Sequence, residues 1–452
     1  MIANYLPSQE LRSCRLVCKL WSVEMDRVLS KRQQLIITDP KSSEAEGVLR
    51  DYKLGRSTGA GTLCFFDISP NSSLFKRLLC KFGWTLSSLK LEECKLKPLD
   101  LKNILLHAAP HLESFSLKDR IPETQVDSTF SIINTLSENK FVLPLLKKLQ
   151  WSEEFGRVQL QEIIKCCPNL VDLEYKHCPI PGEIKHFRSA KWDSLKSLKL
   201  SPRDELRGVH LSSLAALNLK LKRLTLFGLF PKNKARMLKL HDFLKSLSST
   251  LVELELYQHY TLTYQTYSDC KLAKDFLLTT MVLVRSLRMD FAFIKSLKFV
   301  NKFPSLQHFV CRSQGTRDWR TVLAGGSSPR KSSRTYPTLK SMNVGEICHH
   351  SLNRLSNYFS SIVDLEMDAV GLDDRALRII ISGFPLLQEL KIIQKSTFRD
   401  IMKLTDSGIT GIPTEICENI VKNKNYEAID AEKVREYPQI ADLKRKLQFK
   451  RN

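Results

Sequence analysis

A nine-residue phrase that recurs along the chain constrains the fold more than any other feature. Its clearest copy is Leu86-Ser87-Ser88-Leu89-Lys90-Leu91-Glu92-Glu93-Cys94, which has the form L-x-x-L-x-L-x-x-C. In this copy Leu89 and Leu91 alternate with polar residues, and a period of two places alternate side chains on opposite faces of a β-strand. One such strand cannot bury its own leucines, so the copies must bury them together.

Thirteen segments of the chain fit the frame L-x-x-L-x-L. They start at Leu63, Leu86, Leu112, Leu146, Leu170, Leu195, Leu221, Leu251, Val284, Leu306, Leu339, Ile362 and Leu387. Many starts lie 22 to 26 residues apart, and the longer gaps predict insertions in loops or helices. Five copies have a proline two residues before the first apolar position: Pro110, Pro168, Pro304, Pro337 and Pro385. Such a proline ends a preceding helix and starts an extended segment.

This pattern resembles the leucine-rich repeat, in which a strand and a helix or short turn recur every 20 to 29 residues. The resemblance implies an α/β solenoid over residues 62–412: a horseshoe with parallel strands on the concave face and helices outside. Helical spacing at 99–109, 159–167, 240–247 and 377–384 places helices on the convex side. The alternative is an ordinary mixed fold with leucine-rich strands, which the number of copies disfavours.

The N-terminal residues differ from the repeats and predict a helical segment. Apolar side chains recur there at spacings of three and four, at Leu11, Cys14, Val17, Cys18 and Trp21. Ser8 is placed to cap the N-terminus of this helix. A helical segment of this kind would cover the open end of a solenoid, which such folds require in any case.

The same residues resemble part of an F-box. Tyr5-Leu6-Pro7-Ser8-Gln9-Glu10-Leu11 and Arg15-Leu16-Val17-Cys18-Lys19-Leu20-Trp21 match its second half: leucine-proline, an acidic residue before leucine, then arginine-x-valine-cysteine-x-x-tryptophan. Residues 1–34 are therefore expected to form a partial F-box that lacks the family's opening helix. The resemblance implies docking on a Skp-type adaptor, and through it on a cullin. The matching positions are Leu6, Pro7, Leu11, Val17 and Trp21.

An F-box followed by leucine-rich repeats implies a substrate-recognition subunit of a Skp-cullin-F-box ubiquitin ligase. Such a subunit tethers a target protein and supplies no catalytic residue. One alternative is a leucine-rich-repeat interaction scaffold that recruits no ligase. A less favoured alternative is a basic protein that binds nucleic acid or phosphoinositide, since the formal net charge is +22. The basic residues are dispersed, and they do not interleave with aromatic residues as in a single-strand binding platform.

The rest of the chain divides into three further segments. Residues 35–61 are expected to be a linker with a first strand near 35–37. Residues 313–336 form a basic insertion rich in Ser, Gly and Pro, which predicts a mobile loop. Residues 413–452 predict a helical cap or basic tail. No apolar stretch is long enough to span a bilayer, and the twelve cysteines are scattered, so we expect reduced thiols in the cytoplasm or nucleus.

Catalytic and cofactor chemistry finds no support in the sequence. Nucleotide-binding, hydrolase and zinc-protease motifs are absent from the sequence. The nearest approach to a metal cluster is Cys348-His349-His350, but adjacent residues rarely point at one ion, so we expect an ordinary loop there. The chain is therefore expected to be a non-enzyme without metal or cofactor.

A solenoid of this kind binds partners through the residues between its leucines. Charged and aromatic residues in these positions predict a substrate-binding surface that comprises Arg223, Phe227, Glu255, Tyr257, Arg288 and Arg312. For the two aromatic residues, an equal alternative is that each ring packs on its neighbour in the next repeat. Nearer the C-terminus, Asp364, Glu366 and Asp368 predict an acidic row, followed by Glu389 and Lys391.

Overall fold

The structure is a computed structural model, and it describes the repeat region in segments. These segments are residues 34–37, 61–67, 73–82, 86–94, 98–108, 111–118, 142–152, 164–178, 192–202, 206–229, 234–258, 279–294, 297–312, 319, 336–368 and 374–393. Residues 1–33 of the F-box-like segment and the whole of 413–452 lie outside them. The chain divides into two compact units, Met1–Leu221 and Lys222–Asn452, and each is described by itself.

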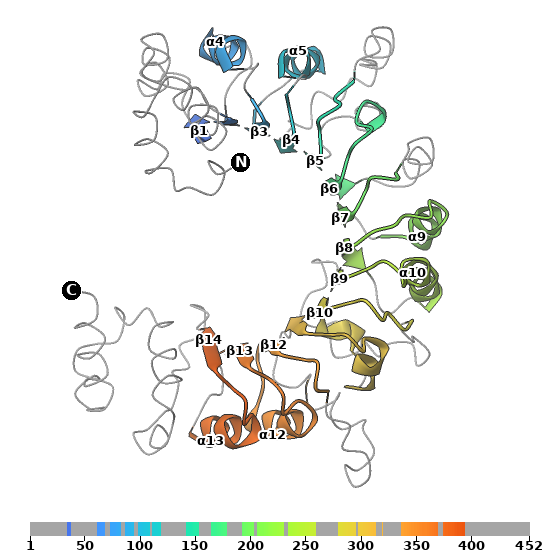
Figure 1. The fold of residues 1–452 in the computed structure, drawn as a ribbon, viewed down its shortest axis with the longest axis vertical. Coiled ribbons are helices and arrows are strands. Elements are labelled where there is room, and N and C mark those ends of the chain that lie inside the picture. The colour runs from blue at the N-terminus through green and yellow to red at the C-terminus, as the bar shows by residue number, and fades with distance from the viewer. Residues whose placement is uncertain are drawn as a thin grey trace, which may run out of the picture. The chain divides into compact units, whose positions relative to one another are not determined.

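Unit 1 contains parallel strands that lie next to one another in sequence order (Figure 1). They are β1 (Gln34–Ile37), β2 (Thr62–Phe66), β3 (Ser88–Glu92), β4 (Ser114–Lys118), β5 (Lys148–Ser152), β6 (Asp172–Cys178) and β7 (Ser197–Pro202). Strand β1 confirms the first strand expected near 35–37, since Leu35 pairs with Leu63 of β2.

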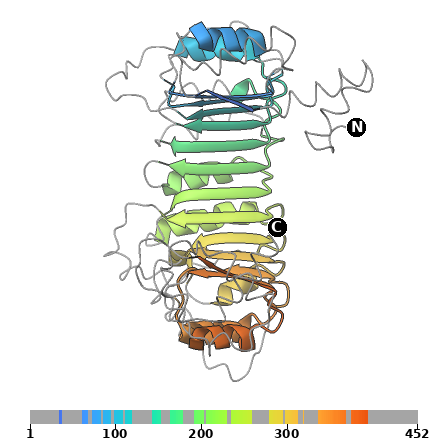
Figure 2. The same cartoon turned by 90° about the vertical axis from the view of Figure 1, so that its left-hand side faces the viewer.

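Unit 2 repeats this arrangement. Its strands are β8 (Arg223–Leu229), β9 (Glu253–Gln258), β10 (Ser286–Asp290), β11 (His308–Arg312), β12 (Ser341–Asn343), β13 (Asp364–Asp368) and β14 (Glu389–Ile393). Figure 2 shows the strands of each unit side by side. Each of the thirteen predicted strand segments overlaps one of the strands β2 to β14.

The register brings equivalent positions of successive repeats together and so builds the core. In unit 1 the two apolar positions of each strand form two buried columns: Leu63, Leu89, Phe115, Leu149, Leu173 and Leu198, and Phe65, Leu91, Leu117, Trp151, Tyr175 and Leu200. No side chain in either column is more than 5% exposed. Burying a leucine of this kind contributes about 1.5–3 kcal/mol, so the columns are the main stabilising feature of the sheet.

Helices lie on one side of the strands in each unit (Figure 1). Unit 1 has α4 (Ser73–Phe82), α5 (Pro98–Ala108) and α9 (Gly208–Ala215), and unit 2 has α10 (Lys234–Ser246), α12 (His349–Tyr358) and α13 (Asp374–Gly383), with 3-10 turns η5 (Phe291–Phe293) and η6 (Leu297–Lys302). The helices predicted at 99–109, 240–247 and 377–384 correspond to α5, α10 and α13. Of the helix predicted at 159–167, the structure describes only residues from 164 onward.

The prolines before the strands have a more specific role than ending a helix. Pro304 and Pro385 occupy the second position of a turn in which the amide two residues later bonds back across the turn: Leu306 to the carbonyl of Phe303, and Leu387 to that of Phe384, both at 3.0 Å. Proline suits this position because its φ is fixed near the required value. Phe303 and Phe384 are only 1% exposed, so each turn starts from a buried ring.

One strand prediction is offset. The frame Leu63-x-x-Phe66-x-Ile68 assigned Leu63 to the first apolar position, but Leu63 pairs with Leu89 and Phe65 with Leu91. Leu63 therefore occupies the second position. Two overlapping segments can be fitted to the frame, one with Leu63 at the first apolar position and one with Leu63 at the second. The register with β3 selects the second fit, in which Leu63 and Phe65 are completely buried.

Within the expected loop at 313–336 the structure describes one interior residue, Trp319. Trp319 is completely buried, and its indole N–H donates to the carbonyl of Val344 at 3.0 Å. Its ring meets Phe291 edge-on with centroids 5.3 Å apart. Burial of a large ring with its N–H satisfied is strongly stabilising, so the insertion is anchored to unit 2 at this point.

Repeated parallel strands, their aligned apolar columns and the helices on one side make each unit a stretch of α/β leucine-rich-repeat solenoid. The prediction of this fold class is confirmed. In the described part of the chain, no helix has the length and apolar character needed to cross a membrane.

Candidate functional site

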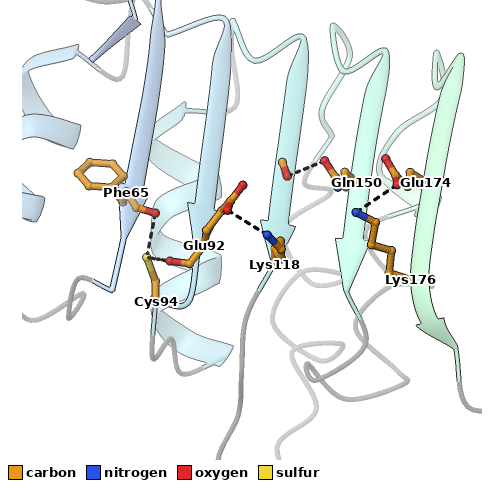
Figure 3. A network of polar contacts seen from close by, with 8 residues as sticks. Phe65, Glu92, Cys94, Lys118, Gln150, Glu174 and Lys176 are labelled. Carbon is orange, nitrogen blue, oxygen red and sulfur yellow. Dashed lines mark hydrogen bonds and ion pairs between the residues drawn. The ribbon is translucent and has the colours of Figure 1, made fainter. Parts of the chain in front are cut away.

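The sheet face opposite the helices carries the polar residues between the leucines, and we call it the open face. In unit 1 these residues pair with one another across strands (Figure 3). Lys118 of β4 forms an ion pair with Glu92 of β3 at 3.2 Å. Ser116 of β4 donates to the side-chain oxygen of Gln150 in β5 at 3.0 Å. Neighbouring repeats thus satisfy much of the polarity of this face internally.

Glu174 of β6 is the most strongly paired carboxylate of that face. Its Oε1 lies 2.8 Å from Nζ of Lys199 and 3.3 Å from Nζ of Lys176. Partial burial by itself would raise the pKa of Glu174, but hydrogen bonds and charge interactions with the two lysines outweigh it. The pKa therefore lies below the usual glutamate range.

This lowered pKa predicts a pH dependence. The two ion pairs stabilise the fold fully above the unfolded-state pKa of a glutamate, about 4.3, and this contribution is lost as pH falls through the lower folded-state pKa. We expect Glu174→Gln to reduce the free energy of unfolding at pH 7 by about 1 kcal/mol or less, because the lysines are partly exposed. The difference from the wild type should vanish at acidic pH. Urea unfolding at pH 7 and pH 3 measures this, and an equal difference at both pH values would contradict it.

Cys94 occupies a repeat position whose side chain hydrogen-bonds to backbone carbonyl groups. Its buried sulfur lies 3.4 Å from the carbonyl oxygens of Phe65 and Glu92 (Figure 3), so the thiol donates toward the turn of the preceding repeat. This agrees with the Asn or Cys of the repeat consensus, because either side chain can bond the backbone there. Seven cysteines are free thiols: Cys64, Cys80, Cys94, Cys166, Cys167, Cys311 and Cys348.

In unit 2, three of the predicted substrate-binding residues form one network on β9 and β10. Glu255 accepts hydrogen bonds from Thr225 at 3.2 Å and from the Tyr257 hydroxyl at 3.3 Å. Its other oxygen lies 3.5 Å from Nε of Arg288. Both oxygens of this carboxylate are therefore engaged, and the network fixes the guanidinium, which remains half exposed.

The two aromatic residues pack on each other. The rings of Phe227 and Tyr257 are stacked with centroids 4.5 Å apart. Tyr257 is only 3% exposed, so the pair matches the alternative in which a ring packs on its neighbour in the next repeat. Phe227 keeps partial exposure at the edge of this stack.

The remaining two predicted residues lie on other strands. Arg223 starts β8 and is exposed. Arg312 ends β11, where its backbone pairs with Asp290. The structure thus brings Phe227, Glu255, Tyr257 and Arg288 together. The predicted adaptor-binding residues lie outside the described part of the chain.

A groove of about 940 Å³ crosses the open face of unit 2. Its walls and floor come from strands β9 to β14 and include charged and small polar side chains: Glu253, Ser286, Arg288, His308, Ser341, Asn343, Asp364, Glu366, Asp368, Glu389 and Lys391. Of the predicted substrate-binding residues, Arg288 lines this groove.

The floor of the groove is made by short polar residues that sequence reasoning missed. Asn343 bonds a carboxylate oxygen of Glu366 through its side-chain amide and accepts from the backbone N–H of Gly345 at 3.1 Å. Gly345 has a φ of 58°, a left-handed conformation that glycine adopts without strain. Asn343 and Gly345, on either side of Val344, were a usable indication, because asparagine and glycine are typical of tight turns.

Metal ligation has no support among the described residues, where no group of three or more His, Cys, Asp and Glu side chains could hold an ion. Cys348 precedes α12 and its thiol lies 3.3 Å from the hydroxyl of Ser351. His349 and His350 begin that helix rather than forming the ordinary loop expected.

Comparisons with known proteins give similarity at the level of fold only. Neither a family model nor a curated protein sequence matches the chain. One similar solved structure is the Rad7 and Elc1 complex in yeast, with 18% identity and a TM-score of 0.41 over 88% of this chain and 92% of the matched chain. Another is the TLR13-ssRNA13 complex, with 13% identity and a TM-score of 0.39 over 87% of this chain and 56% of the matched chain.

Proposed function

We propose that the chain is the substrate-recognition subunit of a Skp-cullin-F-box ubiquitin ligase that works in the cytoplasm or nucleus. In this proposal the open face of unit 2 holds a target protein, and the F-box-like segment docks on a Skp-type adaptor. Tethering raises the effective concentration of the target beside the ubiquitin-transfer machinery, so the chain itself needs no catalytic group.

The groove on β9 to β14 is the observation that carries target binding. It combines a large concavity with a fixed guanidinium, several carboxylates and exposed polar floor atoms. Interfaces gain specificity from charged groups held in place in this way. The ligase part of the proposal is supported by the F-box-like residues of the sequence, from Tyr5 to Trp21.

A pull-down with purified Skp-type adaptor tests the ligase part. We expect the full chain to capture the adaptor and Leu11→Ala combined with Trp21→Ala to abolish capture, because the sequence predicts both residues on one apolar helix face. The double variant should keep the thermal unfolding temperature of the repeats. Leu106→Ala is a matched control, since this leucine of α5 is 41% exposed and lies in the repeat region.

Capture by the double variant equal to that of the wild type would contradict adaptor docking through these residues. Absence of capture by the wild-type chain would favour the alternative, a leucine-rich-repeat scaffold that binds its partner without recruiting a ligase. Binding of the target to unit 2 would remain open to direct measurement in either case.

A further inference from the structure

The groove of unit 2 is strongly acidic at one end. On β13 and β14 its lining contains four carboxylates, Asp364, Glu366, Asp368 and Glu389, and one ammonium group, Lys391. The formal charge of this end is therefore −3, in a chain whose net charge is +22. At physiological salt the screening length is about 8 Å, so a ligand inside the groove responds to the nearby carboxylates more than to distant lysines.

Asp364 and Glu366 of β13 differ in their partners from Glu174 of β6, which lies within 3.3 Å of two lysine ammonium groups. Both strands have Asp at the first open position and Glu at the second, but the third is Lys176 in β6 and Asp368 in β13. Among the described residues, no hydrogen bond or ion pair reaches the side chain of Asp364. Glu366 receives a hydrogen bond from Asn343, which carries no charge.

Lys391 shows that this end of the groove stabilises a positive charge. Its ammonium group lies 3.1 Å from Glu389. The hydrogen bond to Glu389 raises the pKa of Lys391, and the charges of Glu389, Glu366 and Asp364 act in the same direction. The positive charge of Lys391 is thus stabilised at the edge of the acidic row. Its ammonium group directly contacts Glu389, whereas Asp364 and Glu366 act on it through charge alone.

The spacing of these two carboxylates defines the ligand further. Asp364 and Glu366 are alternate residues of one strand, so their side chains project from the same face about 6.6–6.8 Å apart along it. In an extended peptide, alternate side chains have the same spacing and direction, whereas adjacent ones point to opposite sides. A peptide that lies along β13 can therefore place two basic side chains on this pair when one residue separates them.

We propose that the groove binds an extended basic segment of a partner protein, in which two arginine or lysine residues separated by one residue contact Asp364 and Glu366. This inference rests on target binding by unit 2, the first part of the proposed function. Arg288 also lines the groove, on β10, where its guanidinium is paired with Glu255. The charges of the groove oppose a polyanion at the same place.

Two labelled peptides of identical composition test the proposal by fluorescence anisotropy with the full chain. One has the core Arg-Ser-Arg-Ser and the other Arg-Arg-Ser-Ser, each between Gly-Ser flanks. We expect the alternating peptide to bind more tightly, by about fivefold or more, because only its arginines project together onto the pair. Its affinity should weaken with increasing salt, as expected for partly exposed charge pairs.

The variant Asp364→Asn with Glu366→Gln removes both charges with little change in shape. We expect it to weaken binding of the alternating peptide by about tenfold, since each lost contact is a charge-assisted hydrogen bond. The matched control is Asp172→Asn with Glu174→Gln, which removes the same charges at the same repeat positions in unit 1. That control should bind the peptide as the wild type does, and thermal unfolding verifies that both variants fold.

Equal affinity for the two peptides, or unchanged binding by the Asp364 and Glu366 variant, would overturn the proposal. The proposal would also be overturned if a labelled single-stranded oligonucleotide bound the chain and this binding depended on the same two carboxylates. The adaptor pull-down uses the N-terminal segment, so its failure is separate: peptide binding without adaptor capture would support this inference and reject the ligase.

Discussion

Replacing Trp319 by alanine is expected to lower the free energy of unfolding by about 3–5 kcal/mol, the usual cost of removing a large buried ring. The side chain is completely buried against Phe291, and its indole N–H is bonded to the carbonyl of Val344. Alanine would leave a cavity and a buried carbonyl without its donor. Since whole domains are stable by only about 5–15 kcal/mol, this is a large share of the total.

Urea unfolding of the full chain measures this effect, with Trp319→Phe as the control. Phenylalanine keeps most of the ring contact but loses the N–H donor, so we expect a smaller loss, of about 1–3 kcal/mol. A loss below about 1 kcal/mol for the alanine variant would show that the ring is not part of the core. Such a result would restore the mobile loop predicted for the whole of 313–336.

The same tryptophan connects the insertion to the groove. Val344 lies between Asn343 and Gly345, both of which line the groove, and its own N–H donates to the backbone of Glu366 at 3.0 Å. Loss of the Trp319 bond should therefore loosen the turn after β12, which supports the carboxylates of β13. A folded Trp319 variant is expected to bind basic peptides less tightly than the wild type.

The strands were predictable because their determinant is local and repeated. Leu89 and Leu91 alternate with polar residues, and the equivalent pair in each later copy repeats the alternation, so each copy supports the others. Where one segment can be aligned with the repeat frame in two ways, as near Leu63, the sequence still predicts the strand but not its register. Register depends on which residues the neighbouring strand buries, and that is a tertiary property.

The helices on the other side were predicted less completely. Helices α4, α9 and α12 were not expected, although α4 carries a regular apolar face on which Phe75, Leu78 and Leu79 are buried. Gly383 shows how such helices depend on their neighbours: a Cβ atom there would lie 2.5 Å from Cβ of Ser356 in α12. That close approach of α12 and α13 requires glycine, and nothing in the local sequence around Gly383 indicates it.

For the candidate site, the sequence predicted residues better than their arrangement. The positions on β8 to β10 were predicted from the repeat frame, whereas the structure stacks Phe227 on Tyr257 and hydrogen-bonds Glu255 to Thr225 and Tyr257. The register irregularity between Leu226 and Leu229 accompanies this local packing at the strand ends. The acidic row of β13 was equally visible in the sequence, whereas the groove in front of it depends on six strands together.

Two adjacent substitutions on β3 give the sharpest test of the alternation on which the fold depends. Leu89→Asp would place a carboxylate in a column where the wild-type side chain is 0% exposed. It loses about 1.5–3 kcal/mol of apolar burial and adds the cost of a buried unpaired charge, so we expect a total loss of about 5 kcal/mol or more. Lys90→Asp introduces the same side chain one residue later, on the open face, and should change stability by about 0.5 kcal/mol or less.

Thermal and urea unfolding of the full-length variants measure the contrast. If Leu89→Asp fails to give soluble protein, Leu89→Ala provides a second reading, with an expected loss of about 2–5 kcal/mol. The comparison depends on register as well as burial, because Leu89 is held between Leu63 and Phe115 while Lys90 lies between Cys64 and Ser116. Similar losses for aspartate at both positions would mean that β3 does not present one face to the core, and the repeat frame would fail at its clearest copy.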